Sequence, residues 1–230
     1  LRIFLLLSAT VGLPCLLLSA TSPMLQAWYV RERANEIPFW LFALSNIGSL
    51  VALLSFPLIF EPAFDTRSLA IGWSIGFVAF AMSCAFVAWR TRSLSFLRTE
   101  PLETSAPGVP PTSLQMLLWV VLAAGASALL AAATVQLSTN LAPIPLLWVV
   151  PLALYLLTFI LVFSSARFYN RALYFPLFAA AVGGMAWLYT HAESHQHIKY
   201  VIPLYLICLF VICMACHGEI VRRAPAAKYL

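Results

Sequence analysis

Charged side chains are scarce in this chain. They make up 9% of its 230 residues, whereas hydrophobic residues make up 63%. About a quarter of the residues in a typical soluble domain are charged. The composition therefore excludes an ordinary soluble domain.

Motifs that carry chemistry in soluble enzymes are also missing. The sequence contains no GxGxxG motif, no P-loop and no G-x-S-x-G motif. Its five cysteines lie in or at the ends of apolar stretches, so we expect no disulfide framework. The basic residues behind the net charge of +5 are scattered without interleaved aromatic residues, so we expect no nucleic acid partner.

The sequence does hold seven long apolar stretches. They lie near residues 3–20, 38–60, 68–89, 114–136, 144–163, 172–190 and 200–216. As helices, stretches of this length cross a bilayer core of about 30 Å. Backbone groups inside lipid must bond to one another, and segments this long do so as helices. The sequence therefore predicts an all-α, polytopic membrane protein with about seven transmembrane helices.

Positive charges alternate between the gaps that separate these stretches. One set of gaps holds Arg31, Arg33, Arg90, Arg92, Arg98, Arg167, Arg171, Arg222, Arg223 and Lys228, and the other holds Arg2, Arg67 and Lys199. Cytoplasmic loops carry the excess of Lys and Arg in membrane proteins. We therefore expect a multi-pass membrane protein with its N-terminus outside, its C-terminus cytoplasmic and its arginines in contact with anionic lipid.

One long polar stretch predicts the domain organisation. Residues 90–113 contain four prolines together with Ser, Thr and Glu. Such a composition cannot bury a core. We expect a three-span membrane segment at 1–89, a flexible cytoplasmic linker at 90–113, a four-span membrane segment at 114–217 and a cytoplasmic tail at 218–230.

Two local patterns predict finer structure. Helices in lipid associate by close packing, so stripes of small residues indicate contact faces. The stripes are Gly72 with Gly76, Ala124 with Ala128 and Ala132, and Ser45, Gly48, Ser49 and Ala52. In addition, Thr21-Ser22-Pro23 resembles a helix start, which predicts a short interfacial helix at residues 24–33.

Polar residues inside or at the ends of the apolar stretches are the candidate site. Asn46 lies near the middle of the second stretch, and Glu61 lies at its end. A buried amide in lipid needs a partner, so Asn46 should face the helix bundle. It either joins two helices by a hydrogen bond or lines a solute path.

His217-Gly218-Glu219 stands where the last apolar stretch ends. Ionisable residues at this depth are often functional or paired. The simpler interpretation is a helix end, in which Gly218 helps to break the helix and Glu219 pairs with an arginine one turn on.

Two patterns resemble cofactor sites. Cys213, Cys216 and His217 match the C-x-x-C-H motif of covalent haem attachment. Haem of this type is attached outside the cytoplasm, whereas the charges put this end inside, so we interpret the match as coincidental. The loop with His191, His195 and His197 is a weak candidate for a Zn²⁺ or Cu²⁺ site, and otherwise a polar loop tip. We expect no cofactor.

Four stretches resemble a known family. They are Leu18–Trp28 (LSATSPMLQAW), Leu44–Pro62 (LSNIGSLVALLSFPLIFEP), Pro143–Phe159 (PIPLLWVVPLALYLLTF) and Cys216–Glu219 (CHGE). They are similar to the membrane region of bacterial fused major-facilitator/spermidine-synthase proteins. The resemblance implies functional positions at Asn46, Glu61, His217 and Glu219, with roles unassigned.

In that family a soluble aminopropyltransferase-like domain follows the membrane spans. This chain has no Gly-rich nucleotide loop, so we expect no synthase activity within it. The leading hypothesis is an inner-membrane domain of the family, transporter-like or membrane-anchoring, with a polyamine as the implied solute. One alternative is a structural membrane subunit of a larger complex, without a substrate of its own. The other is a membrane enzyme that uses His217 and Glu219. The partners that we expect are the lipid bilayer and other membrane subunits or a fused or separate cytosolic domain.

Overall fold

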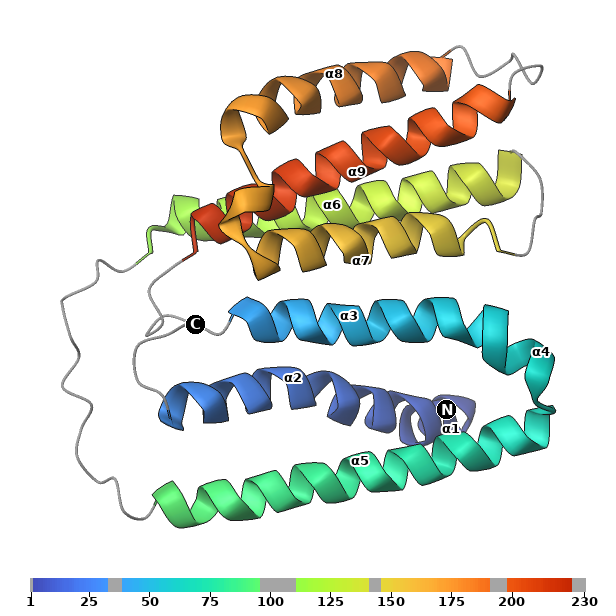
Figure 1. Ribbon diagram of the computed structural model, residues 1–230, viewed down its shortest axis with the longest axis vertical. Helices are drawn as coiled ribbons and strands as arrows, with labels where there is room; N and C mark the ends of the chain where they lie inside the picture. The colour runs from blue at the N-terminus through green and yellow to red at the C-terminus, as the bar shows by residue number, and fades with distance from the viewer. Residues whose placement is uncertain (1, 33–38, 96–110, 141–145, 191–197, 225–230) are drawn as a thin grey trace. The chain divides into compact units, whose positions relative to one another are not determined.

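The computed structural model describes residues 2–32, 39–95, 111–140, 146–190 and 198–224, and these residues form helices and turns with no strand (Figure 1). Among these described residues, six helical segments are long and apolar enough to cross a membrane: Arg2–Gln26, Trp40–Ala63, Thr66–Arg90, Ser113–Ser138, Arg171–Leu188 and Tyr200–Arg222. Val149–Ser164 is a shorter apolar helix. The prediction of an all-helical chain with about seven apolar helices is therefore confirmed.

Contacts group the chain into two compact units, which differ from the predicted segments 1–89 and 114–217. The first consists of Leu1–Glu36 and Leu58–Val109, and the second of Ile37–Pro57 and Pro110–Leu230. The difference arises because helix α3 (Phe39–Ser55) packs against α7 (Val149–Ser164) in the second unit.

The first unit begins with one continuous helical run. It comprises α1 (Arg2–Leu7), the π-helical turn η1 (Ser8–Gly12) and α2 (Leu13–Glu32). Pro14 has no N–H to donate to the preceding turn, and a π-turn is a common adjustment to such a gap.

The predicted helix start at Thr21-Ser22-Pro23 is wrong. Helix α2 continues through Pro23 to Glu32. The Thr21 hydroxyl donates back to the carbonyl of Leu17 at 2.9 Å, so it belongs to the running helix and does not cap a new one.

The remaining helices of the first unit are α4 (Glu61–Ala63), which follows the π-turn η2 (Phe56–Phe60), and α5 (Thr66–Ser95). Asp65 caps α5, because its carboxylate accepts hydrogen bonds from the N–H groups of Arg67 and Ser68 and from the Ser68 hydroxyl. The Ser68 hydroxyl bond is the main reason that the pKa of Asp65 is lowered. Helix α5 extends six residues into the predicted linker 90–113.

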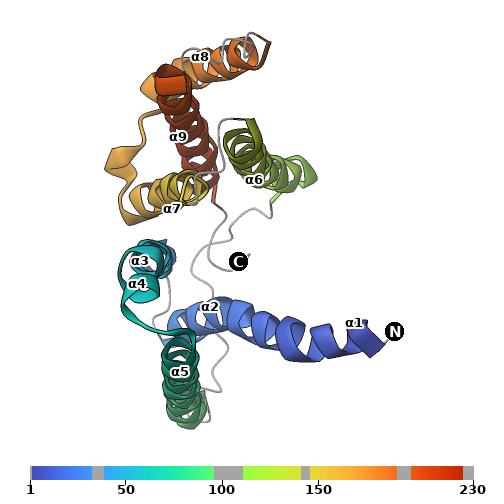
Figure 2. The ribbon, with the colours of Figure 1, turned by 90° about the vertical axis from the view of Figure 1, so that its right-hand side faces the viewer.

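In the second unit, α9 (Ile198–Arg222) packs against α6 (Ser113–Asn140), α7 and α8 (Arg171–Thr190), as Figure 2 shows. The core is built from small and aliphatic side chains of α6, α8 and α9: Ala126, Ala133, Ala181, Cys208, Leu209, Ile212, Cys213 and Cys216. Helix α9 also runs past residue 217, so the predicted tail 218–230 starts as helix.

The small-residue stripe on α6 was predicted on the wrong face. Ala126 and Ala133 are buried, whereas Ala124, Ala128 and Ala132 are exposed. The buried alanines share their face with Leu122, Leu129 and Leu137, which fill the space between helices while the alanines allow close approach. The other predicted stripes, on α3 and α5, are exposed as well.

The helices of the second unit alternate in direction. The indole N–H of Trp119, near the start of α6, donates to the carbonyl of Arg223, just after α9 (3.1 Å). The rings of Phe42, near the start of α3, and Phe163, near the end of α7, lie 5.5 Å apart. The starts of α3, α6 and α8 and the ends of α7 and α9 therefore meet at one end of this unit. We call it the arginine end, because Arg167, Arg171, Arg222 and Arg223 lie there.

Candidate functional site

Glu219 is the polar centre of the arginine end. Its Oε1 accepts a hydrogen bond from the Tyr169 hydroxyl (3.0 Å) and lies 3.4 Å from Nε of Arg171. Its Oε2 accepts a hydrogen bond from Nε of Arg223, one turn along α9 (3.0 Å). The Glu219 side chain is 12% exposed, so three donors surround a largely buried carboxylate. The expected pairing with an arginine one turn on is present, and two further partners come from the α7–α8 connection and the start of α8.

Gly218 lies inside α9, and the prediction that it breaks the helix is wrong, because α9 continues to Arg222. A glycine is required at this position for another reason. A Cβ atom built there would collide with the ring of Tyr169. The missing side chain thus lets the α7–α8 connection lie directly on α9, which brings the Tyr169 hydroxyl to Glu219.

Tyr169 remains a neutral donor over the ordinary pH range. Burial and then the hydrogen bond and charge of Glu219 raise the pKa of Tyr169 to about 12, although Arg171 and Arg222 act in the opposite direction. Its ring also stacks on that of Tyr174 in α8, with centroids 5.5 Å apart. The residue therefore links α8 and α9 through both its ring and its hydroxyl.

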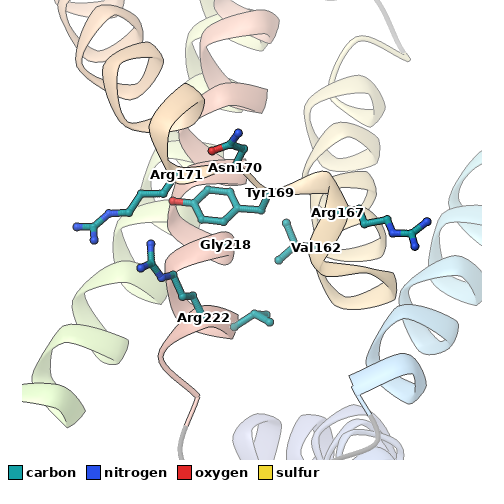
Figure 3. Close-up of a pocket in the computed structure, with 8 residues that line it drawn as sticks. Val162, Arg167, Tyr169, Asn170, Arg171, Gly218 and Arg222 are labelled. Carbon is teal, nitrogen blue, oxygen red and sulfur yellow. The ribbon is translucent and has the colours of Figure 1, made fainter.

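A pocket of about 660 Å³ opens beside these residues. It is lined by Val162, Arg167, Tyr169, Asn170, Arg171, Gly218, Val221 and Arg222. In Figure 3, the side chains of Arg171 and Arg222 extend to the same side of the pocket, whereas Arg167 extends to the opposite side. Arg167, Arg171 and Arg222 make the pocket positively charged.

His217 is buried next to this region but does not line the pocket. It is 1% exposed, and its Nδ1 lies 3.0 Å from the Thr158 hydroxyl on α7. Thr158 donates its single hydroxyl proton to the carbonyl of Tyr155 (2.7 Å), so Nδ1 of His217 must carry the proton that joins them. Phe159 packs on the imidazole with a centroid distance of 3.9 Å, and Tyr155 meets it edge-on at 5.1 Å.

Nε2 of His217 has no hydrogen-bond partner among the residues that the structure describes. With Nδ1 protonated, Nε2 is the unprotonated nitrogen. An enzyme that used His217 as acid or base would need a path from this nitrogen to substrate, and apolar rings cover the imidazole on α7. The arrangement is that of a helix-packing histidine.

Asn46 bonds within its own helix, and Glu61 belongs to the other unit. The Asn46 amide donates to the carbonyl of Phe42 in its own helix at 2.8 Å, and the side chain is half-buried on α3. Glu61 is exposed at the start of α4, in the first unit. Of the four candidate residues, only His217 and Glu219 share an element, and they contact different partners.

The cofactor patterns have two outcomes. Cys213 and Cys216 are buried in the core between helices, with His217 turned toward α7. His191, His195 and His197 lie outside the described residues, and within those residues no three His, Cys, Asp or Glu side chains gather as a metal site.

Sequence reasoning missed Thr158 and Tyr169, the two hydroxyl residues that hold His217 and Glu219. Tyr169 stands in no motif, and Thr158, although it lies within the Pro143–Phe159 stretch, is separated from His217 by 59 positions. The pocket arginines did carry a signal, because Arg167, Arg171 and Arg222 belong to the set of basic residues assigned to one face. Comparison with protein families, with curated proteins and with solved structures found no match.

Proposed function

We propose that this chain is a multi-pass domain of the bacterial inner membrane that works as a membrane-anchoring module, with a packed interior and no solute path of its own. The observation that carries the proposal is the filling of the second unit. Leu209, Cys213 and Ala126 are fully buried where α6 and α9 meet, and the cluster around them is apolar.

A solute carrier for a polar substrate needs polar side chains along its path. Asn46, the residue that would line such a path, instead bonds to the carbonyl of its own helix. An Asn side chain can be satisfied in this way by a backbone carbonyl of its own helix, without a partner on another helix. Within the part of the chain that the structure describes, the bonding of Asn46 therefore favours an anchoring function over transport.

The charge of the pocket also argues against a polyamine as its ligand. Three arginines line it, and polyamines are cations. Like charges in a partly buried site repel one another. The polyamine link therefore rests on the family resemblance alone.

The first unit supports membrane anchoring in a different way. None of its described residues is buried, and α5 exposes large apolar side chains such as Trp73, Ile75 and Met82. Exposed apolar helices of this length require lipid or the helices of another subunit around them. Membrane subunits are thus among the partners that we expect.

The orientation follows from the charges. The arginine end gathers Arg167, Arg171, Arg222 and Arg223, all from the set that the positive-inside rule assigns to the cytoplasm. We place this end and the C-terminus in the cytoplasm and the N-terminus outside. Green fluorescent protein fused after Leu230 should fluoresce, and alkaline phosphatase inserted within 191–197 should be active. The opposite pair of results would reverse the orientation.

Uptake into proteoliposomes tests the anchoring function. Labelled putrescine and spermidine should enter liposomes that contain the chain no faster than protein-free liposomes. The matched variant is Asn46→Leu, which should behave like the native chain. Uptake that exceeds the protein-free rate and falls in Asn46→Leu would overturn the proposal in favour of transport.

A further inference from the structure

We propose that the pocket at the arginine end is a binding site for a phosphate oxyanion, either the phosphodiester of an anionic lipid headgroup or a free phosphate. This inference goes beyond anchoring, and it depends on the pocket and its charges rather than on the direction in which the chain crosses the membrane.

The first argument is a charge imbalance. Four arginines lie at this end, namely Arg167, Arg171, Arg222 and Arg223. Glu219 is the single carboxylate among the described residues of the second unit, and it neutralises one of them. Three positive charges therefore remain in and around one pocket, and a phosphate group, which carries one or two negative charges, would offset part of them.

The second argument concerns free donors. A guanidinium has five N–H groups. Arg171 directs its Nε toward Glu219, which leaves its terminal nitrogens available. Arg222 forms no ion pair with any described carboxylate. These two side chains extend to the same side of the pocket (Figure 3), and the proposed anion would bind there.

The backbone of α8 does not provide the site. Asn170 caps this helix, and its side chain accepts the N–H of Ala172 (3.0 Å). The N–H groups of Leu173 and Tyr174 bond to the carbonyl of Asn170. With those three amides satisfied, the guanidinium groups are the main donors of the proposed site, with the positive end of the α8 dipole as an added favourable field.

Size and chemistry agree with a phosphate group. A volume of about 660 Å³ lies within the range of small-molecule sites. Arginine binds phosphate in bidentate fashion, and basic pockets between transmembrane helices accept anionic headgroups. Val162 and Val221 add an apolar wall to the pocket, and the first acyl carbons of a lipid could pack against it.

The first experiment measures protection of individual arginines in the full chain. Phenylglyoxal modifies exposed guanidinium groups, and peptide mass spectrometry reports the rate for each one. Inorganic phosphate in micelles, or phosphatidylglycerol in nanodiscs, should slow modification of Arg171 and Arg222 but not of Arg67 in the first unit. Protection by phosphate in micelles identifies a free oxyanion as sufficient, and protection only in phosphatidylglycerol nanodiscs identifies the lipid. Equal rates under both conditions and in phosphatidylcholine would overturn the site.

The second experiment uses a variant that should leave the fold intact. Arg222→Gln removes a side chain with no ion pair to lose among the described residues. It should weaken phosphatidylglycerol binding, counted by native mass spectrometry, roughly tenfold, because hydrogen bonds to charged groups contribute on that scale. Arg90→Gln makes the same charge change on α5 and should bind like the native chain. Equal binding by Arg222→Gln and the native chain at an unchanged unfolding temperature would refute the proposal.

Discussion

The hydroxyl of Tyr169 donates a hydrogen bond of 3.0 Å to the carboxylate of Glu219, 50 positions further along the chain. This bond ties the α7–α8 connection to the end of α9. The carboxylate is largely buried and also holds Arg171 and Arg223, so the four side chains form one network. Its members are mutually dependent, because a buried charge that loses a partner is costly.

Tyr169→Phe removes this hydrogen bond while keeping the ring. We expect the free energy of unfolding to fall by about 1–2 kcal/mol, less than the full value of a charged hydrogen bond, because two arginines still hold Glu219. Unfolding in mixed micelles with increasing SDS measures it. Tyr174→Phe is the matched control, since it removes a hydroxyl from the neighbouring ring of the stacked pair. If both variants lose the same free energy of unfolding, the hydrogen bond from Tyr169 to Glu219 does not stabilise the fold as we expect.

The same bond predicts an alkaline transition. Burial and Glu219 raise the pKa of Tyr169 to about 12 from the ordinary tyrosine pKa of 10.0. The folded chain thus holds this proton more tightly than the unfolded chain. The stabilisation is complete below pH 10 and is lost as the pH rises through about 12. Phenolate absorbance of the native chain minus that of Tyr169→Phe should show a single group that titrates near this value. A midpoint at the ordinary tyrosine pKa would contradict the buried contact.

Gly218→Ala should separate α9 from the α7–α8 connection. The added methyl group collides with the Tyr169 ring, and overpacking of this kind costs about 1–3 kcal/mol. The measurement is again SDS unfolding. Gly125→Ala, on α6, is the control, because a Cβ atom at that position has no neighbouring atom within 4 Å.

A second substitution distinguishes this collision from a general helix effect. Tyr169→Ala removes the ring, so the double variant with Gly218→Ala should be only slightly less stable than Tyr169→Ala alone. If the double variant instead loses as much stability as the two single variants together, the added methyl group acts somewhere other than on the Tyr169 ring.

The sequence predicts the helices well because their signal is local. Long apolar runs such as 114–136 and 200–216 contain few charges. A backbone segment of that length in lipid satisfies its own hydrogen bonds by forming a helix. Helix ends were less well predicted, since Pro23 and Gly218 both continue a helix. In these cases tertiary contacts or back-bonding hydroxyls outweigh the local preference.

Partners across helices could not be predicted, for a physical reason. Alanines occur all around α6, so composition alone does not select Ala126 over Ala124; the neighbouring leucines do. Likewise, the spacing of Glu219 and Arg223 predicts their ion pair one turn apart on a helix. The contact of Glu219 with Tyr169 instead depends on how the chain leaves α7. Long-range pairs of this kind have no periodicity to reveal them.

The pairing of His217 with Thr158 gives the last prediction. Thr158 accepts the Nδ1 proton of His217 while donating its own to Tyr155. Thr158→Val keeps the shape but leaves that proton without an acceptor, at a cost of about 1–3 kcal/mol. His217→Phe with Thr158→Val replaces both partners by apolar groups, and Phe159 already offers the new ring a stacking surface. The double variant should therefore recover most of the stability that Thr158→Val loses in SDS unfolding. If the double variant is instead less stable than either single variant, the imidazole has a further partner through Nε2, and His217 is more than a packing residue.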